Sequence, residues 1–368
     1  MHIIDRNHLK ISILPKDIFV DGIVNPIPSS AVTEKNVKGR CVYILEKNSD
    51  YAIAQRNLVE QFLSKIEVNN SAKGFRKNLS YLNFLEPHAS NYYFLRLDVK
   101  NFFHSIDERL LKKCFFIYFK DEFIDSNNKQ KLLDAFMNLI TFYVPSSSKN
   151  INCKEKRIIP VGFSSSPLIS NIFFRSIDIL LQKLCIAFNI TYTRYADDLL
   201  FSAVRGCEYI HSDSFEKEVR IILGTMSLKI NNNKIIRAKH RISLNGYVIQ
   251  ARSLSKKKSA NDYNGVFISN KKTETIGKVL YELSLNSVDY KKIMEKIIGN
   301  KIKISDFNYP LTYGFIIKYY KTQTRNYLSG YRSYLISFLK FNEIYRCVPD
   351  IKINVYKDLL DKIDKFLV

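Results

Sequence analysis

Two adjacent aspartates, Asp197 and Asp198, lie between two short segments rich in apolar and aromatic residues. The segments 190–195 and 199–203 have the length and composition of β-strands, and only three residues separate them. The sequence therefore predicts a hairpin with acidic residues at its tip. Neighbouring carboxylates in such a turn repel each other unless a cation or a hydrogen-bond network compensates for the repulsion.

A third aspartate, Asp98, lies near the end of the segment 92–99, which the sequence predicts to be another strand. Carboxylates on neighbouring strands suit Mg²⁺, and two such ions roughly 3.5–4 Å apart can activate a 3′-hydroxyl and stabilise a leaving pyrophosphate. The plainer alternative is that the aspartate pair is ordinary turn chemistry and that Asp98 caps a loop or helix.

The charge of the chain points to a polyanionic partner. Its 368 residues carry a formal net charge of +22, while 46% of them are hydrophobic, so the chain can fold and is also a polycation. The N-terminus lacks the basic-then-apolar order of a signal peptide, and no stretch approaches the roughly 20 apolar residues of a membrane span. The six cysteines form no metal-binding pattern. We expect a cytoplasmic protein with reduced thiols and no membrane partner.

The hydrophobic pattern predicts an α+β body followed by a basic helical module. Helices are expected at 52–65, within 109–142, from Pro167 to about Phe188, at 214–226 and from about 271 onward; strands are expected at 92–99, 157–162, 190–195, 199–203, 228–230 and within 240–250; a polar loop is expected at 146–156. Lysines and tyrosines in the last third favour contact with nucleic acid, although a solvated helical face would look similar.

The order of five motifs resembles the reverse transcriptase family. The motifs are Leu97-Asp98-Val99-Lys100-Asn101-Phe102-Phe103, Pro160-Val161-Gly162-Phe163-Ser164-Ser165-Ser166-Pro167-Leu168-Ile169-Ser170-Asn171, Tyr195-Ala196-Asp197-Asp198, Ile230-Asn231-Asn232-Asn233-Lys234 and Leu244-Asn245-Gly246-Tyr247. The resemblance implies a right-hand polymerase. Its fingers would be 1–95 and 108–157, its palm, an antiparallel sheet with helices on one face, would be 96–107 and 158–250, and its basic helical thumb would be 251–368.

The resemblance also implies roles for individual residues. The catalytic residues would be Asp98, Asp197 and Asp198, and together with Val99 they would hold two Mg²⁺ ions, which Mn²⁺ could replace. The incoming nucleotide would contact Lys38, Arg40, Phe103, Val161, Gly162 and Lys234. The template and primer would contact Ser164, Ser165, Pro167, Asn171, Tyr195, Asn245 and Gly246.

Several of these residues have a plainer interpretation. Phe103 would reject a ribonucleotide by a clash with its 2′-hydroxyl, whereas its neighbour Phe102 is better read as a core residue. Lys38, Arg40 and Lys234 could equally be solvated surface cations. The three serines are not a hydrolase nucleophile, because no Gly-x-Ser-x-Gly elbow surrounds them; their hydroxyls could cap the following helix.

Differences from the family pattern indicate which subgroup of reverse transcriptases the chain resembles. Val161 stands where most members carry Gln, and the chain lacks the Val-Thr-Gly and Asn-Ala-x-x-His signatures of retrons. The resemblance implies a defence-associated bacterial reverse transcriptase that copies RNA, with a non-coding RNA, a second copy of the chain or a companion defence protein as partners. A retron enzyme, a template-independent or protein-primed DNA polymerase, an inactive nucleic-acid-binding scaffold and an RNA-dependent RNA polymerase are the alternatives.

Overall fold

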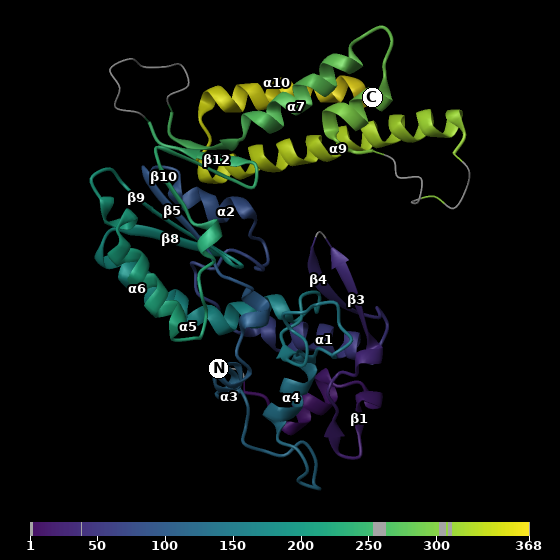
Figure 1. Cartoon of the computed structure of the whole chain (residues 1–368), viewed down its shortest axis with the longest axis vertical. Helices are drawn as coiled ribbons and strands as arrows, with labels where there is room; N and C mark the ends of the chain where they lie inside the picture. Colours follow the sequence, from purple (N-terminus) through teal and green to yellow (C-terminus); the bar gives the residue numbers. More distant parts are fainter. Residues whose placement is uncertain (1–2, 38, 253–262, 302–306, 308–310, 368) are drawn as a thin grey trace. The chain divides into compact units, whose positions relative to one another are not determined.

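The computed structural model describes residues 3–37, 39–252, 263–301, 307 and 311–367 (Figure 1). Lys38, predicted to contact the nucleotide, lies outside the described residues. The chain divides into two compact units, one made of Met1–Phe84 and Tyr93–Arg237, the other of Leu85–Tyr92 and Ala238–Val368.

The first unit combines small hairpins, helices and a central sheet. Its elements are β1 (Phe19–Val20), β2 (Ile23–Val24), β3 (Val32–Val37), β4 (Arg40–Leu45), α1 (Asp50–Gln61), α2 (Tyr81–Leu85, which reaches the second unit), β5 (Tyr93–Asp98), η6 (Phe102–Ser105), α3 (Glu108–Phe116), α4 (Leu132–Ile140), β6 (Phe142–Tyr143), β7 (Arg157–Ile158), α5 (Ser166–Ala187), β8 (Ile190–Tyr195), β9 (Asp198–Ala203), α6 (Asp213–Gly224) and η8 (Asn232–Lys234). The expected α+β class is confirmed.

The central sheet has the strand order β10-β5-β9-β8, in which β10 (Ile236–Lys239) spans the division between the units. Strand β9 pairs antiparallel with both of its neighbours, so the hairpin predicted around the aspartate pair is confirmed. Leu199, Leu200 and Phe201 of β9 are fully buried, because β9 lies inside the sheet and helices α5 and α6 pack against one face (Figure 1). Burial of this apolar strand fixes the position of the acidic turn at its start.

Two local predictions need correction. Residues 228–230 are not a strand; Ile230 forms only an isolated antiparallel bridge to Val99. The serine hydroxyls do not cap helix α5, because Ser165 at its N-cap makes no capping hydrogen bond and the Ser166 hydroxyl donates to the Pro160 carbonyl instead (2.7 Å). Pro167 does occupy the first turn of the helix, as predicted.

The second unit combines a small sheet with helices. Its elements are β11 (Arg241–Leu244), β12 (Tyr247–Gln250), β13 (Gly265–Ile268), α7 (Asn270–Leu283), α8 (Tyr290–Lys292), η9 (Ile293–Ile298), α9 (Tyr313–Tyr345) and α10 (Asp350–Leu367). The predicted strand pair within 240–250 is confirmed, and it pairs with β13 in an antiparallel sheet. The Tyr356 hydroxyl of α10 accepts a hydrogen bond from the Ile268 amide (2.9 Å), which ties this helix to the sheet.

Two expectations about the whole chain can be compared with the described residues. No helix in the described part of the chain is long and apolar enough to cross a membrane. The six cysteines are free thiols; Cys153 and Cys185 are buried and the other four are partly buried.

Candidate active site

A pocket of about 310 Å³ in the first unit collects residues from several of the predicted motifs. Arg40 of β4, Asp98 of β5 and Asp197 of the hairpin turn line it, together with Phe103, Val161 and Lys234. These residues are up to almost 200 positions apart in the sequence, and the fold brings them around one cavity. Three other predicted residues, Asp198, Gly162 and Tyr195, do not line it.

Asp98 is the most buried acidic residue of the pocket, and three polar side chains surround its carboxylate. The Lys234 ammonium lies 2.9 Å from Oδ2, the Asn231 amide donates to Oδ1 (3.2 Å), and the Arg96 guanidinium lies 3.7 Å from Oδ2. The Asp98 side chain is only 4% exposed. Such burial of a carboxylate is costly unless charged and hydrogen-bonding partners compensate for the lost hydration, and these three groups do so.

Asp197 lies in the tight turn between β8 and β9 and faces the same pocket. Its carbonyl accepts a hydrogen bond from the Val99 amide (2.9 Å), which ties the turn to the end of β5. Burial raises the pKa of Asp197, and the charge of nearby Asp98 raises it further, while Arg40 and Lys234 oppose the shift. The protein therefore holds this carboxylate where a bound cation would relieve its electrostatic cost.

Asp198 has different surroundings from its neighbour. It is the register partner of Asp98, and its carboxylate is bound by the Arg96 guanidinium, with Nε at 2.9 Å. Burial raises the pKa of Asp198, and Arg96 opposes this shift. The Arg96 guanidinium therefore neutralises Asp198 and, more weakly, Asp98.

The donor set fits a magnesium site that is completed by substrate. Among the described residues, no three acidic, histidine or cysteine side chains converge on one point suited to a metal ion. Mg²⁺, however, is usually bound by one or two carboxylates together with water and substrate phosphates, rather than by a cage of protein ligands. Asp98 and Asp197 offer two hard oxygen donors at the wall of a pocket large enough for part of a nucleotide.

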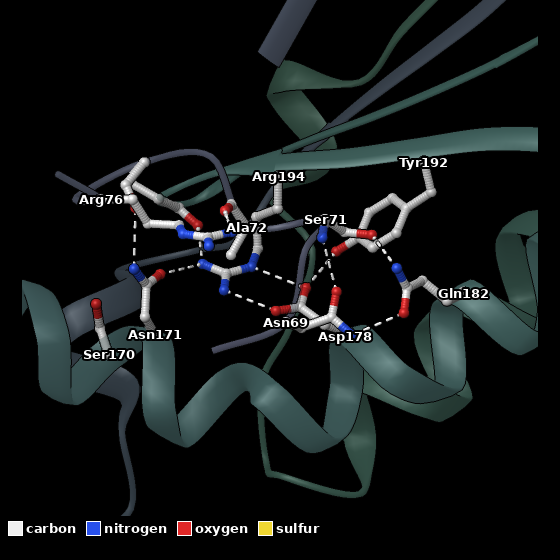
Figure 2. A network of polar contacts seen from close by, with 12 residues as sticks. Asn69, Ser71, Ala72, Arg76, Ser170, Asn171, Asp178, Gln182, Tyr192 and Arg194 are labelled. Carbon is white, nitrogen blue, oxygen red and sulfur yellow. Dashed lines mark hydrogen bonds and ion pairs between the residues drawn. The ribbon is translucent and has the colours of Figure 1, made fainter. Parts of the chain in front are cut away.

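The acidic turn is supported from behind by a buried network that centres on Arg194. Figure 2 shows its guanidinium between Asn171 and Asp178 of helix α5. Arg194 and Asp178 are both fully buried; the guanidinium binds both oxygens of this carboxylate, at 3.0 and 2.8 Å, and donates to the Asn171 side chain (3.0 Å). It also donates to the carbonyl of Ala196 (3.2 Å), the residue before Asp197. The network therefore holds the backbone of the turn that carries Asp197.

Gly74 also lies against the turn that carries Asp197 and is bonded to the same network. Asn171 donates to the Gly74 carbonyl (2.9 Å), and a Cβ added at Gly74 would lie 2.8 Å from the Ala196 amide nitrogen. Ala196 itself has a φ of 55°, a left-handed conformation that is unfavourable for alanine. Asn171 is fully buried, and its side chain bonds Gly74 and Arg194 in this structure, which gives it a positioning role; its contact with template or primer stays a prediction.

Aromatic rings extend from the pocket toward the hairpin. The Phe103 ring lies 6.1 Å from that of Phe75, which lies 6.4 Å from that of Tyr195. Tyr195 also contacts Tyr81 in an edge-to-face arrangement at 5.0 Å. Phe102 is 97% buried and packs against Phe174, which confirms its assignment to the core.

The backbone at Val161 and Gly162 joins the pocket to the β3–β4 hairpin. The Tyr43 amide donates to the Val161 carbonyl (2.8 Å). Gly162 has a φ of 116°, and a Cβ at this position would lie 2.4 Å from the Tyr43 carbonyl oxygen. Glycine is therefore required for the close approach of the hairpin that carries Arg40 to the pocket wall.

The remaining predicted template and primer residues are distributed more widely. Ser164 is exposed, whereas Ser165 is fully buried and its backbone amide donates a hydrogen bond to the Gln55 side-chain oxygen (3.3 Å). Asn245 and Gly246 form the β11–β12 turn in the second unit, where both have positive φ. The Lys272 ammonium lies 3.4 Å from the Asn245 carbonyl and over the ring of Tyr247.

Several residues of the site were missed by sequence reasoning. Arg96 could have been found, because it lies two residues before Asp98 on a predicted strand and must share its face. Asn231 lies in the same motif as Lys234, and only the fold shows that its side chain bonds Asp98. His104, Asn150 and Asn152 also line the pocket, and nothing in their local sequence indicates this, because the fold alone brings the polar loop to η6.

Comparison with known proteins independently supports the resemblance to reverse transcriptases. The family model described as "Reverse transcriptase (RNA-dependent DNA polymerase)" matches residues 39–249. The retron Ec73 reverse transcriptase of Escherichia coli is 30% identical over 207 residues, which cover 55% of this chain and 62% of the relative. The retron Ec83 enzyme of the same species is 31% identical over 186 residues, covering 50% and 55%. The chain thus spans somewhat more than half the length of these curated relatives.

The solved structures that the comparison returned are more distant in sequence. A telomerase from Candida albicans in complex with a fragment of telomeric RNA covers 92% of this chain and 64% of its own, with a TM-score of 0.44 and 13% identity. A foamy viral protease–reverse transcriptase in complex with double-stranded DNA covers 99% and 49%, with a TM-score of 0.36 and 13% identity. Since the family model matches more than half of the chain, this protein belongs to the reverse transcriptase family.

Proposed function

We propose that this chain is an RNA-directed DNA polymerase that adds deoxynucleotides to a 3′-hydroxyl with the help of two Mg²⁺ ions. The observation that carries the proposal is the placement of Asp98 and Asp197 on the wall of one pocket, together with Arg40 and Lys234. Two carboxylates beside two cations suit a triphosphate whose charge is shared between metal ions and basic side chains.

Each side chain around the pocket has a defined part in this reaction. Asp98 and Asp197 would hold the metal ions, which when bound would activate the primer hydroxyl and stabilise the leaving pyrophosphate. Arg40 would bind the triphosphate. Lys234, which pairs with Asp98 at 2.9 Å, would exchange this contact for the phosphate charge when the nucleotide arrives. Phe103 would exclude a ribose 2′-hydroxyl by its bulk.

The domain roles follow from the same proposal. Residues 1–95 and 108–157 would serve as fingers, 96–107 and 158–250 as palm, and 251–368 as thumb. The partners would be a template RNA, the DNA product and deoxynucleoside triphosphates, joined by a non-coding RNA and by a second copy of the chain or a companion protein. Basic residues of the second unit would neutralise phosphates. We place the activity in bacterial antiphage defence, in the cytoplasm.

A retron reverse transcriptase is the second candidate, and the comparisons favour it. Both relatives described above are retron reverse transcriptases by name. The absence of the Val-Thr-Gly and Asn-Ala-x-x-His sequences from the chain argues against this assignment. The two candidates differ in product, because a retron enzyme would leave its DNA linked to RNA, and ribonuclease treatment would then shorten the product.

The test is to purify the chain with the nucleic acid that it carries, sequence that material, and supply Mg²⁺ and labelled deoxynucleotides. A product complementary to a co-purified RNA supports templated synthesis. A simple-sequence or protein-linked product would instead indicate template-independent or protein-primed synthesis. The motivation for this alternative is Val161, which stands where most family members carry Gln. If no nucleotide is incorporated in an Asp197-dependent way under any of these conditions, the polymerase proposal is refuted.

A further inference from the structure

Glu216 of helix α6 is a buried acidic residue that does not line the pocket. Its side chain is 11% exposed, and two guanidinium groups share its carboxylate. Arg220, four residues later in α6, binds Oε1 through Nε (2.9 Å) and Nη2 (2.5 Å), and Arg237 binds Oε2. Burial of a carboxylate is costly unless such partners compensate for its lost hydration. One carboxylate therefore holds two cationic side chains in place.

The two arginines connect Glu216 to both sides of the short helix η8. Arg220 Nη2 donates to the side-chain oxygen of Asn232, the first residue of η8 (2.7 Å). Arg237 follows η8 in strand β10. Lys234, the last residue of η8, lies between Asn232 and Arg237 in the chain. Glu216 thus ties α6 to the segment that carries the pocket lysine.

Strand β5 holds the same segment from the pocket side. The Asn231 amide donates to the Asp98 carbonyl (2.7 Å), and the Lys234 ammonium lies 2.9 Å from Asp98 Oδ2. Because η8 has three residues, its position depends on contacts with its neighbours more than on its own hydrogen bonds. Loss of the link to α6 would leave the contacts on the Asp98 side to hold the segment.

The place of η8 matters because Lys234 has to change partners in the proposed reaction. Its ammonium pairs with Asp98 in this structure and would move to the phosphates of the nucleotide. A lysine side chain has a flexible four-carbon stem, so the point that its ammonium can reach is determined by where its backbone is held. When the contact with Asp98 is given up, the link from Asn232 to Arg220 is still in place.

We propose that Glu216 and Arg220 are positioning residues that hold η8 through Asn232, so that Lys234 reaches the phosphates of the incoming nucleotide. The inference rests on the proposed polymerase function, because Lys234 is the group through which both residues act. It predicts that the effect of breaking this link depends on the presence of the Lys234 ammonium.

The test is a double-mutant cycle of kcat/KM for dTTP on a poly(rA) template with an oligo(dT) primer. Asn232→Ala removes the acceptor for Arg220, and we expect kcat/KM to fall roughly three- to tenfold, the value of one hydrogen bond. In a Lys234→Met background the same substitution should change kcat/KM less than about twofold. Asn232→Asp keeps an acceptor for Arg220 and should retain most of the wild-type rate.

Glu216→Gln tests the other end of the link. The substitution keeps the size of the side chain and removes the charge that holds both arginines, so its effect on kcat/KM should also require Lys234. Because Glu216 is buried, this variant should melt at a lower temperature, whereas Asn232 is exposed and its substitution avoids that loss.

Asn233→Ala is the matched control. Asn233 is the next residue of η8, is exposed, and bonds the Asn231 side chain through its backbone amide (3.3 Å), which alanine keeps. Its kcat/KM should equal that of the wild type in both backgrounds.

Two results would overturn the inference and leave Glu216 and Arg220 a role in stability alone. One is an equal fall of kcat/KM on Asn232→Ala with and without the Lys234 ammonium; the other is wild-type kcat/KM in both Asn232→Ala and Glu216→Gln. Either result in an active wild type refutes the inference and leaves the polymerase function standing. If the wild type incorporates no nucleotide, the polymerase function is refuted, and this inference with it.

Discussion

Asp98 and Asp198 are direct partners in the register of strands β5 and β9, and the Arg96 guanidinium lies beside both carboxylates. Like charges on opposite strand positions destabilise a sheet, so this arrangement depends on the arginine. Asp197, one residue earlier, lies in the turn and faces the pocket instead. Two adjacent aspartates of one motif therefore have different surroundings, and substitutions at the two positions should differ in effect.

We expect Asp197→Asn to lower nucleotide incorporation by at least about 10²–10³-fold, because it removes a carboxylate from the pocket where charge must be balanced during the reaction. Asp198→Asn should also lower incorporation, but less, since this carboxylate acts first on Arg96. Initial rates at saturating nucleotide measure both effects. Equal residual rates would contradict the different placement of the two residues.

RNA affinity provides the control for these variants. Both should bind a template and primer within about threefold of the wild type, because most of the affinity comes from phosphate contacts that the substitutions leave in place. Asp213→Asn, an exposed acidic residue in the first turn of α6, is the matched surface substitution and should preserve both rate and affinity.

The raised pKa of Asp197 leads to a prediction about stability. Because its pKa in the folded protein lies above the ordinary value of 3.8, the native state binds this proton more readily than the unfolded chain does. Stability from this group is therefore lost as the pH rises through that window, and Asp197→Asn removes the loss. Without divalent cations, the variant should melt at a higher temperature than the wild type at pH 7, and the difference should shrink toward pH 4.

Added Mg²⁺ should change this comparison. A ligand that binds only the folded state stabilises it by mass action, so Mg²⁺ together with a nucleotide should raise the melting temperature of the wild type more than that of Asp197→Asn. Thermal denaturation with Mg²⁺ and with a chelator measures the effect. Equal shifts in both proteins would show that Asp197 does not take part in metal binding.

Local sequence patterns predict the helices and strands that carry the site. They do not predict contacts between side chains that are far apart in the sequence. The hairpin of β8 and β9, strand β5 and helix α5 depend on apolar composition, strand alternation and Pro167, all of which can be read in one short window. The contact of Arg194 with Asp178, in contrast, joins two charged residues whose polar character alone suggests a surface position. Only the completed packing shows that they are buried.

The same limit applies to motif residues that the fold buries. The motif predicts that Asn171 and Ser165 contact template or primer, and the fold buries both side chains fully, so that contact stays a prediction. A motif records which residue types a family needs, and it does not distinguish those that touch a substrate from those that hold the backbone. Burial, known only from the fold, makes this distinction.

Phe103 should determine the choice between deoxyribonucleotides and ribonucleotides. Phe103→Ala removes the ring from the pocket wall and should raise kcat/KM for ribonucleotides relative to deoxyribonucleotides by at least tenfold, because the exclusion is steric. Phe102→Leu is the control: Phe102 is 3% exposed and packs on Phe174, so its substitution should lower stability and leave sugar selectivity unchanged. A Phe103→Ala enzyme with wild-type sugar selectivity would remove this residue from the proposed gate.

Gly74 should be needed for the geometry of the turn that carries Asp197. In Gly74→Ala the new methyl group would lie 2.8 Å from the Ala196 amide nitrogen and 3.3 Å from backbone atoms of Tyr195. Backbone atoms cannot move aside as a flexible side chain can, so the turn that carries Asp197 must shift. We expect kcat to fall at least tenfold with template affinity nearly unchanged, since displacement of a reacting group by a fraction of an ångström is costly.

Gly224→Ala separates this effect from a general response to a lost glycine. Gly224 ends helix α6, and a Cβ at this position would meet nothing within 4 Å. Alanine favours the helix by about 0.5–1 kcal/mol relative to glycine, so this variant should be as stable as the wild type or more so, with unchanged kcat. If Gly74→Ala retained the wild-type kcat while folding normally, Ala196 and Asp197 would have to tolerate displacement, and the support that Arg194 and Asn171 give the turn would serve stability alone.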